Sequence, residues 1–502
     1  MREKYESLPL VQLKELAKVR GLKGTSTMKK AELVEAMLAE DERLKKEEEA
    51  KAAEQKQESA TETVRSEEPQ KQERSERPVR QERNYRPDRN YRGESAENVG
   101  VRSEAYTKER TFNPNNVAYD ESQYPKELDS GIEASGILEV MPDGYGFIRC
   151  ENYMPGENDV YVAPSQIRRF GLKTGDILKG NKRIKTQQEK FSALLFVKSI
   201  NGYTVEESSK RMAFEDMTPI FPDERIKMET PGCSIAMRVM DLVSPVGKGQ
   251  RGMIVSPPKA GKTTLLKEVA KSILRGNPKM HMLILLIDER PEEVTDIKEA
   301  IHGDNVEVIY STFDELPEHH KRVSEMVIER AKRLVEHKMD VVILLDSITR
   351  LTRAYNLVVP PSGRTLSGGL DPAALHMPKR FFGAARNMRE GGSLTILATA
   401  LVETGSKMDD VVYEEFKGTG NMELVLDRKL SEKRVFPAID IVKSGTRRED
   451  LLLDKEELEA VGIMRKAING MRTDEAVENI LNMFARTRDN QEFIHMVKKN
   501  RI

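Results

Sequence analysis

Cysteine is scarce in this chain. Only two cysteines, Cys150 and Cys233, occur among 502 residues, and they form no C-x-x-C pair. This scarcity argues for a reducing compartment and against a disulfide framework or a structural zinc site. The seven histidines show no metal-ligand spacing either. We therefore expect neither a disulfide-stapled fold nor a zinc-stabilised one.

Long apolar runs are absent as well. No stretch of the sequence approaches the roughly 18 apolar residues that a membrane-spanning helix needs. The first residues, MREKY, contain none of the apolar core of a secretory signal. We expect a cytoplasmic protein with no membrane partner.

Charge is abundant and unevenly distributed. Charged residues make up 33% of the chain and hydrophobic residues 38%, while the net charge is only −1. At roughly 150 residues per domain, this length predicts about three domains. The changes in composition along the chain indicate where one domain ends and the next begins. The first domain is a small helical module over residues 1–45, where Leu10, Leu13 and Leu16 repeat at helical spacing and Thr27 is a candidate N-cap.

Residues 46–128 have almost no material for a core. Between residues 47 and 110 the only branched aliphatic side chains are four valines, which is too little apolar surface to offset the entropy of ordering. The segment is predicted to be a disordered, arginine-rich insertion. An arginine recurs every third residue from Arg74 to Arg92, and this series is either an RNA tether, with Tyr85 and Tyr91 available for stacking, or a solvated linker neutralised by its glutamates. The sequence leaves the two readings open.

Short strands broken by glycines follow over residues 129–205 and predict a β-barrel of the OB or cold-shock kind. Tyr145 and Phe147 are two residues apart on one strand, so both rings point to the same face. Flanking glycines favour base stacking over the alternative that these rings fill the core, and nearby arginines suit phosphates. The candidate RNA contacts here are Tyr145, Phe147, Arg149, Tyr161 and Phe191.

Residues 206–224 are expected to be a connector. From residue 225 to 502, strands alternate with amphipathic helices, as in an α/β domain with a largely parallel sheet.

Near the start of the α/β domain, residues 256–263 (SPPKAGKT) lie between an apolar strand and a helical pattern. Such a loop presents backbone N–H groups to anionic oxygens, with Lys262 reaching the outer phosphates and Thr263 placing its hydroxyl on Mg²⁺. Ser256 replaces the usual first glycine of this motif.

Two further strands end in acids. The run 340–346 ends in Asp346, which is predicted to organise Mg²⁺, and the run 283–287 is followed by Asp288 and Glu289. Because parallel strands deliver their carboxyl ends to one edge, Glu289 is placed to polarise the water that attacks the γ-phosphate. The alternatives are that Asp346 caps a helix and that Glu289 pairs with Arg290.

Three loops carry candidate functional cations. Arg364 lies in a glycine-rich loop over residues 360–369, and Lys407 lies in a second such loop over residues 403–408. Single cations on such loops suit the grip on a moving polyanion. Arg447 is a candidate finger toward the nucleotide of a neighbouring subunit, with a solvated arginine as the alternative.

Five segments together resemble the bacterial transcription termination factor Rho family, and the resemblance covers residues 130–502: residues 143–149 (DGYGFIR), 257–263 (PPKAGKT), 288–295 (DERPEEVT), 344–350 (LLDSITR) and 417–424 (KGTGNMEL). The resemblance implies a hexameric ring with an outer RNA site and a RecA-type P-loop ATPase domain around a channel lined by the loops of Arg364 and Lys407. It implies that Lys259 assists at the γ-phosphate, that Glu289 is the general base, that Arg447 acts in trans and that Phe436 lies against adenine. The expected nucleotide contacts are Pro258, Lys259, Ala260, Gly261, Lys262, Thr263, Thr264, Arg290 and Phe436.

The predicted function is that of an ATP- and Mg²⁺-dependent helicase that translocates on RNA, binds nascent single-stranded RNA with a lean to pyrimidines, and terminates transcription. A homohexamer is expected, with RNA polymerase and elongation factors as partners. Two alternatives remain: a rotary ATP-synthase-type subunit, which resembles this chain at residues 436–440, and a passive RNA-binding regulator. The aromatic pair Tyr145 and Phe147 argues against the first, and the set Lys262, Glu289 and Asp346 argues against the second.

Overall fold

The computed structural model describes residues 126–186 and 189–500, together with four isolated helical positions before them, Lys30, Val34, Ala36 and Ala39. The predicted disordered insertion and most of the predicted N-terminal module lie outside these described residues. The barrel and the α/β domain belong to one compact unit of the chain, residues 109–502.

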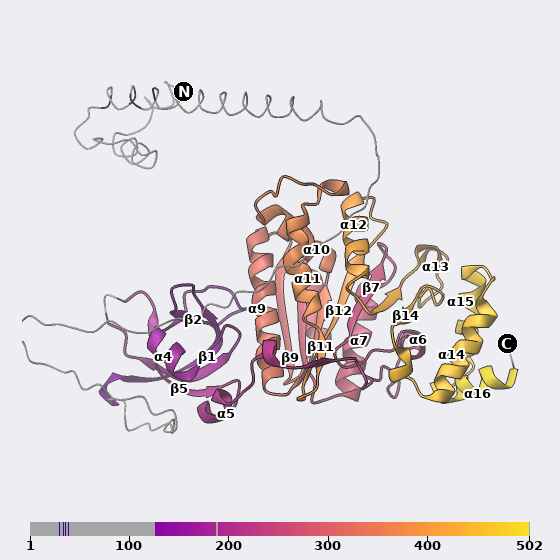
Figure 1. Cartoon of the computed structure of the whole chain (residues 1–502), viewed down its shortest axis with the longest axis horizontal. Helices are drawn as coiled ribbons and strands as arrows, with labels where there is room; N and C mark the ends of the chain where they lie inside the picture. Colours follow the sequence, from indigo (N-terminus) through magenta and orange to yellow (C-terminus); the bar gives the residue numbers. More distant parts are fainter. Residues whose placement is uncertain are drawn as a thin grey trace, which may run out of the picture. The chain divides into compact units, whose positions relative to one another are not determined.

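The first part of this unit is a closed β-barrel, as predicted (Figure 1). Its interior is apolar, and Leu138, Ile148 and Val160 are fully buried there. The helix α4 (Pro164–Phe170) contributes Ile167 and Phe170 to the same core. The strands pair in the order β1 (Asp129–Val140), β2 (Gly146–Arg149), β3 (Val160–Val162), β5 (Ser192–Ile200), β4 (Ile177–Arg183), after the short η3 (Lys126–Leu128).

The connector is packed rather than free. Its helix α5 (Val205–Ser209) begins with a capping box, in which Thr204 and Glu207 satisfy each other's backbone N–H groups. After η4 (Phe214–Asp216), the strand β6 (Pro219–Ile220) pairs with β11 (Arg386–Met388) of the following domain. The connector therefore contributes to the sheet of that domain.

The α/β domain (residues 225–500) is built on a sheet whose central strands are parallel, as the alternating pattern predicts. Antiparallel pairs also occur among the described strands: β14 pairs with β13, β11 with β12, and β6 with β11. The strand order is β14 (Gly445–Thr446), β13 (Met422–Val425), β7 (Arg251–Ser256), β12 (Ser393–Leu401), β10 (Asp340–Asp346), β8 (His281–Glu289), β9 (Val306–Thr312).

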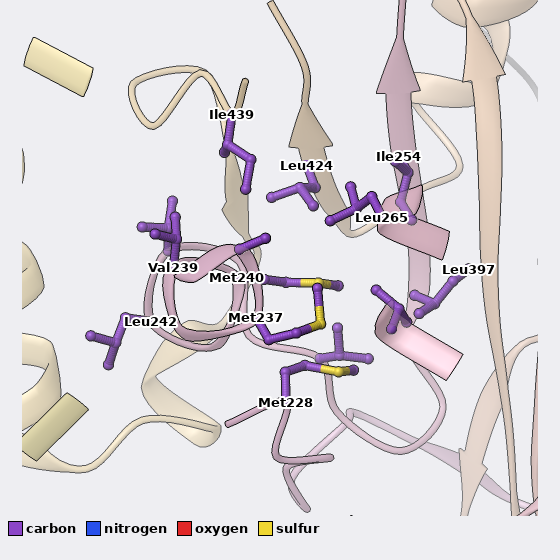
Figure 2. Packing of buried hydrophobic residues seen from close by; sticks show 14 of the residues in the cluster. Met228, Met237, Val239, Met240, Leu242, Ile254, Leu265, Leu397, Leu424 and Ile439 are labelled. Atoms are coloured by element: carbon purple, nitrogen blue, oxygen red, sulfur yellow. The ribbon is translucent and has the colours of Figure 1, made fainter. Parts of the chain in front are cut away.

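Helices cover both faces of this sheet, because successive residues of a buried strand point to opposite sides. In β7, Ile254 joins one apolar cluster while Met253 and Val255 join the other. Figure 2 shows part of the first cluster, where Met237 and Met240 point from their helix toward the strands that carry Ile254 and Leu424. That face carries α6 (Ile235–Val243), α7 (Lys262–Gly276), α8 (Pro291–Ala300), α14 (Lys455–Ile468), α15 (Thr473–Ala485) and α16 (Asn490–Asn500).

The second face carries the longest of the described helices, α9 (Pro317–Glu336), which contributes Val323, Val327 and Val335 to the other apolar cluster. Shorter elements complete the domain. They are α10 (Ile348–Val358), η5 (Ser367–Gly369), η6 (Pro372–Leu375), α11 (His376–Gly383), α12 (Lys407–Lys417), α13 (Arg428–Glu432) and η7 (Glu449–Leu451).

The two-faced core generates a stability prediction. Leu344 lies fully buried in β10, between β12 and β8. Leu344→Ala should lower the free energy of unfolding of this domain by about 2–5 kcal/mol, because a cavity adds to the lost burial. Chemical denaturation followed by circular dichroism measures the change. Leu357→Ala, at a side chain that is 75% exposed, should stay within ~0.5 kcal/mol of the unsubstituted protein. Equal effects of the two substitutions would contradict the assigned core.

Candidate nucleotide and RNA-binding sites

The loop between β7 and α7 is shaped to receive an anion. The N-cap of α7 is Gly261, whose φ of 92° is left-handed, and no side chain caps the helix there. The first N–H groups of α7 are therefore open to an anionic ligand. A Cβ at Gly261 would lie 4.0 Å from the Phe436 ring and would be strained by that φ, so glycine is required for conformation rather than for space. Pro258, Lys259 and Thr264 are exposed around this loop.

Lys262 lies between the two predicted acids. Its Nζ donates to Glu289 Oε1 at 2.9 Å and to Asp346 Oδ1 at 2.6 Å. The acids end β8 and β10, so the carboxyl edge of the parallel sheet brings together three residues that are far apart in sequence. Burial lowers the pKa of Lys262, but Asp346 and Glu289 outweigh this effect and raise the pKa overall. Lys262 is therefore held as a cation.

Each acid retains an oxygen without a hydrogen-bond partner. Among the described residues, Glu289 Oε2 and Asp346 Oδ2 are buried and accept no hydrogen bond. Asp346 Oδ1 also accepts from Thr399 Oγ1 at 2.8 Å, which fixes the carboxylate. Burial, reinforced by the charge of Asp346, raises the pKa of Glu289. Glu289 therefore has more basic character than an ordinary glutamate, as a proton acceptor requires.

The structure rejects both structural alternatives for these acids. The N-cap of α10 is Ser347, whose hydroxyl accepts from Arg350 N at 3.2 Å, so Asp346 does not cap this helix. Glu289 pairs with Lys262, and at 3.7 Å with Arg350, rather than with Arg290, which is exposed at the start of α8. Arg350 was missed in the sequence, although it follows Asp346 in the same LLDSITR motif.

The residues present fit Mg²⁺ only together with a phosphate ligand. Among the described residues, no group of three or more His, Cys, Asp or Glu side chains could hold a metal by itself. Mg²⁺ is commonly held by one or two carboxylates plus substrate phosphates and water. The unpartnered oxygen of Asp346 and the hydroxyl of Thr263, 3.4 Å from Glu293 Oε2, match this requirement.

A cavity of about 410 Å³ adjoins the loop and is mostly apolar. Phe436 lines this cavity, and 52% of its surface is exposed, so its ring is free to stack on another planar group. A cavity of this size and lining suits a nucleobase. Its walls include Ala260, Gly261, Thr264, Leu265, Phe436 and Pro437.

Arg447 lies at the opposite end of the sheet. Thr446 pairs with Met422, which pairs with Gly252 near the start of β7, whereas the phosphate loop follows the end of β7 at Ser256. Four residues of strand separate the two places by roughly 13 Å. Arg447 is exposed and lines a separate cavity of about 780 Å³. Within its own chain, Arg447 is therefore not part of the Lys262 site.

The two cation-bearing loops lie side by side. Gly368 packs so tightly against the backbone of the second loop that an added Cβ would lie 2.3 Å from Met408 N. Lys407 is exposed but is the first residue of α12, so its predicted loop ends at Ser406; Arg364 is exposed in the other loop. The structure thus places both predicted cations on one surface region.

Four aromatic rings form a cluster on the barrel, which we call the aromatic cage: Tyr145, Phe147, Tyr161 and Phe191. The ring centroids of Tyr145, Phe147 and Tyr161 are 5.9 Å from one another, and those of Phe147 and Phe191 are 5.2 Å apart. All four are partly exposed and lie outside the buried core cluster of the barrel. The alternative that these rings fill the core is therefore wrong.

Arg149 differs from the prediction. Only 6% of its side chain is exposed, and it pairs with Glu139 at 2.7 Å and with Asp159 at 2.5 Å. Its guanidinium lies 4.8 Å from the centre of the Phe147 ring. Arg149 is thus a buried support beside the aromatic cage rather than an exposed phosphate ligand, because the two carboxylates hold it in place.

Asp159 is a further polar group beside the cage that sequence reasoning missed. It is 2% exposed, and its Oδ1 is buried without a hydrogen-bond partner among the described residues. Its only signal in the sequence is its position before the strand that carries Tyr161. A buried, unpartnered acceptor next to exposed rings is suited to a ligand that brings a donor.

Among the residues that the structure describes, no helix is long and apolar enough to cross a membrane.

Comparison with known proteins identifies three parts of the chain. The Rho termination factor N-terminal domain matches residues 4–41, the Rho termination factor RNA-binding domain matches residues 134–206, and the nucleotide-binding domain of the ATP synthase alpha/beta family matches residues 236–446. The nucleotide site thus lies in a domain that binds ATP, and the aromatic cage lies in one that binds RNA.

Relatives that match most of this chain are named transcription termination factor Rho. The chain is 57% identical over 381 residues to transcription termination factor Rho of Pseudomonas aeruginosa, covering 74% of this chain and 90% of the relative. It is 56% identical to that of Bacillus subtilis, covering 74% of this chain and 86% of the relative, and 55% identical to that of Escherichia coli, covering 74% and 88%. With these identities over most of both chains, the chain belongs to the transcription termination factor Rho family.

Proposed function

We propose that this chain is an RNA-dependent ATPase and helicase that loads single-stranded RNA on its barrel and moves along it to terminate transcription. The chain is an RNA-binding, ATP-dependent termination factor by family. One observation carries the finer proposal: the same compact unit holds an exposed aromatic cage and a phosphate loop whose lysine lies between two buried acids. A base-stacking surface and a hydrolytic centre in one unit suit a motor that works on RNA.

The residues at the nucleotide site divide the work. The open N–H groups of α7 and the cation of Lys262 bind the outer phosphates, while Lys259 on the exposed loop assists at the γ-phosphate. Phe436 and its cavity hold the base. Glu289 accepts a proton from the attacking water, which its raised pKa favours. Mg²⁺, held by Thr263, Asp346 and the phosphates, would neutralise developing charge.

The aromatic cage is the proposed loading site for RNA, and its polar neighbours favour cytosine. Bases stack on its rings with about 1–3 kcal/mol each. The free Oδ1 of Asp159 accepts the amino proton of a cytosine, and Arg149 donates to an acceptor on the same base edge. Adenine offers a similar donor and acceptor. Its second ring places them farther from the sugar, so they do not meet Asp159 and Arg149 in the same way. Within pyrimidine-rich RNA, this pair favours cytosine over uracil, because uracil has no amino group to donate to Asp159.

The position of Arg447 supports an assembly in which active sites are shared. Because Arg447 is far from the phosphate loop of its own chain, it reaches a nucleotide only across a subunit boundary. We therefore propose a homohexameric ring, with Arg364 and Lys407 lining the channel through which RNA passes. RNA polymerase and its elongation factors are the proposed partners, and the cytoplasm is the proposed location.

Both alternative functions are less well supported. A rotary ATP-synthase-type subunit shares the nucleotide-binding domain but has no use for an exposed base-stacking cage. A passive RNA-binding regulator does not require a lysine held between two acids, nor a raised pKa at Glu289.

The first functional prediction concerns Glu289. Glu289→Gln should leave ATP affinity nearly unchanged and nearly abolish turnover, because the amide preserves the shape of the site but accepts no proton. Lys262→Ala should weaken both binding and turnover. Fluorescent-nucleotide binding and phosphate release measure the two quantities. Glu292→Gln, at an exposed acid on α8, is the matched control and should hydrolyse ATP normally. Turnover of the Glu289 variant at the normal rate would refute its role as base.

The second prediction concerns Arg447. Arg447→Ala should reduce hydrolysis by about 10³–10⁵-fold, the usual contribution of a finger in trans. Mixing this variant with Lys262→Ala protein should restore part of the activity, since some interfaces then combine an intact loop with an intact arginine. Arg448→Ala, next to Arg447 and paired with Asp450, controls for a general change in the loop. Mixed rings that form but recover no activity would count against a shared site.

The third prediction separates RNA loading from RNA sensing. The double variant Tyr145→Ala and Phe147→Ala should lose affinity for pyrimidine-rich RNA with little change in salt dependence, because it removes stacking but no phosphate contact. Lys407→Ala should load RNA normally and lose RNA-stimulated hydrolysis. Phe221→Ala, an exposed ring outside the cage, is the control. Filter binding across a salt titration, with ATPase assays, reports both effects. Normal loading by the cage variant would overturn the assignment.

A further inference from the structure

A chain of alternating charges runs from the aromatic cage to the α/β domain. Asp159 pairs with Arg149 at 2.5 Å, and Arg149 pairs with Glu139 at 2.7 Å. Glu139 in turn accepts from a nitrogen of Arg322, at 2.8 Å for Oε1 and 2.6 Å for Oε2. Arg322 lies on α9, so this last contact joins residues 183 positions apart. The cage is thus connected to a helix outside the barrel.

Burial makes these contacts specific. The exposed fraction of the side chain falls from 34% at Arg322 to 16% at Glu139, 6% at Arg149 and 2% at Asp159. A charge with so little water around it needs an opposite charge nearby. Glu139 has Arg149 and Arg322 as partners, and Asp159 has Arg149. A single nitrogen of Arg322 contacts both oxygens of Glu139, so it fixes the position of that carboxylate.

The orientation of Arg149 depends on the carboxylate of Glu139. Nε of Arg149 donates to Glu139 and NH1 donates to Asp159, so two of its three nitrogens are fixed by acids. The same guanidinium lies against Phe147 of the cage. A shift in the position of the Glu139 carboxylate therefore changes the direction in which Arg149 faces a bound base.

We propose that Arg322 is a positioning residue for base recognition: acting through Glu139, it holds Arg149 in the orientation that distinguishes a cytosine at the aromatic cage. This inference rests on the proposed function, in which the cage is the site of RNA loading. Arg322 does not contact RNA itself. Because coupling between two sites is reciprocal, a base that engages Arg149 also changes the strength of the contact between the barrel and α9.

A purely adhesive role is the competing explanation, since other pairs also join the barrel to α9. Lys173 reaches Glu336 at 3.2 Å and Tyr203 stacks on His337 with ring centroids 4.3 Å apart, both at the far end of that helix. Lys173 is not a member of the chain of charges that leads to the cage. Lys173→Ala therefore loosens the same boundary without disturbing Arg149, and is the matched control.

The test uses the full chain and fluorescently labelled oligocytidine and oligoadenosine RNAs, and measures the ratio of the two dissociation constants. Arg322→Ala should reduce the preference for cytosine by about three- to tenfold, a part of what one good side-chain-to-base pair supplies. Most of this change should come from weaker binding of oligocytidine. Arg322→Lys, which keeps the charge, should recover part of the preference, and Lys173→Ala should leave the ratio unchanged.

A double variant tests the route. If Arg322 acts through Glu139, adding Arg322→Ala to Glu139→Gln should change the ratio no further than the more severe single variant does. Equal loss of affinity for both RNAs, or an unchanged ratio in Arg322→Ala, would overturn the inference while leaving the cage as the RNA site. If removal of Tyr145 and Phe147 also leaves oligocytidine binding intact, the proposed loading site fails, and the inference fails with it.

Discussion

The nucleotide site depends on one geometric constraint, namely that parallel strands end at a common edge of the sheet. The ends of β8 and β10 place Glu289 and Asp346 on either side of Lys262, which begins α7 after a third strand. Two buried acids alone would repel each other, and a buried lysine alone would lose its charge. Together they stabilise one another, and we propose that the phosphates of a nucleotide displace the acids from the lysine. The raised pKa of Glu289 results from the same burial. The apolar layers on both faces of the sheet are what keep these strand ends in register.

RNA recognition uses a different principle, because a small barrel has little interior to spare. Its core is filled by aliphatic side chains, and the four rings of the cage are left on the surface, where they contact one another and a buried arginine. Arg149 pairs with Glu139, and Glu139 pairs with Arg322 of the α/β domain. The barrel is therefore held to that domain by side-chain contacts as well as by the connector. The connector adds the strand β6 to the sheet of the α/β domain, so it too joins the barrel to that domain.

Local patterns in the sequence were sufficient to predict the phosphate loop, the strand-end acids, the closed barrel and the parallel sheet, because each depends on short-range spacing or on strand periodicity. The pairing of Arg149 was not predictable in this way: its partners Glu139 and Asp159 lie outside its own strand, and nothing in the local spacing distinguishes a buried arginine from an exposed one. Arg322 was beyond reach for the same reason, being 183 residues from its partner. The location of Arg447 at the far end of the sheet became visible only from the strand register, which links Thr446 to Gly252 through Met422.

In the proposed function, RNA bound by this chain drives its ATP hydrolysis. The most direct measurement is the steady-state rate of phosphate release by the full-length protein, with ATP and Mg²⁺, in the presence and absence of polycytidylic acid. We expect slow hydrolysis without RNA and a large increase when the polymer is added. A rate that is high without RNA and unchanged by it would favour a rotary-type ATPase. The absence of hydrolysis under both conditions, in protein that binds RNA, would favour a passive regulator, and either result would contradict the account.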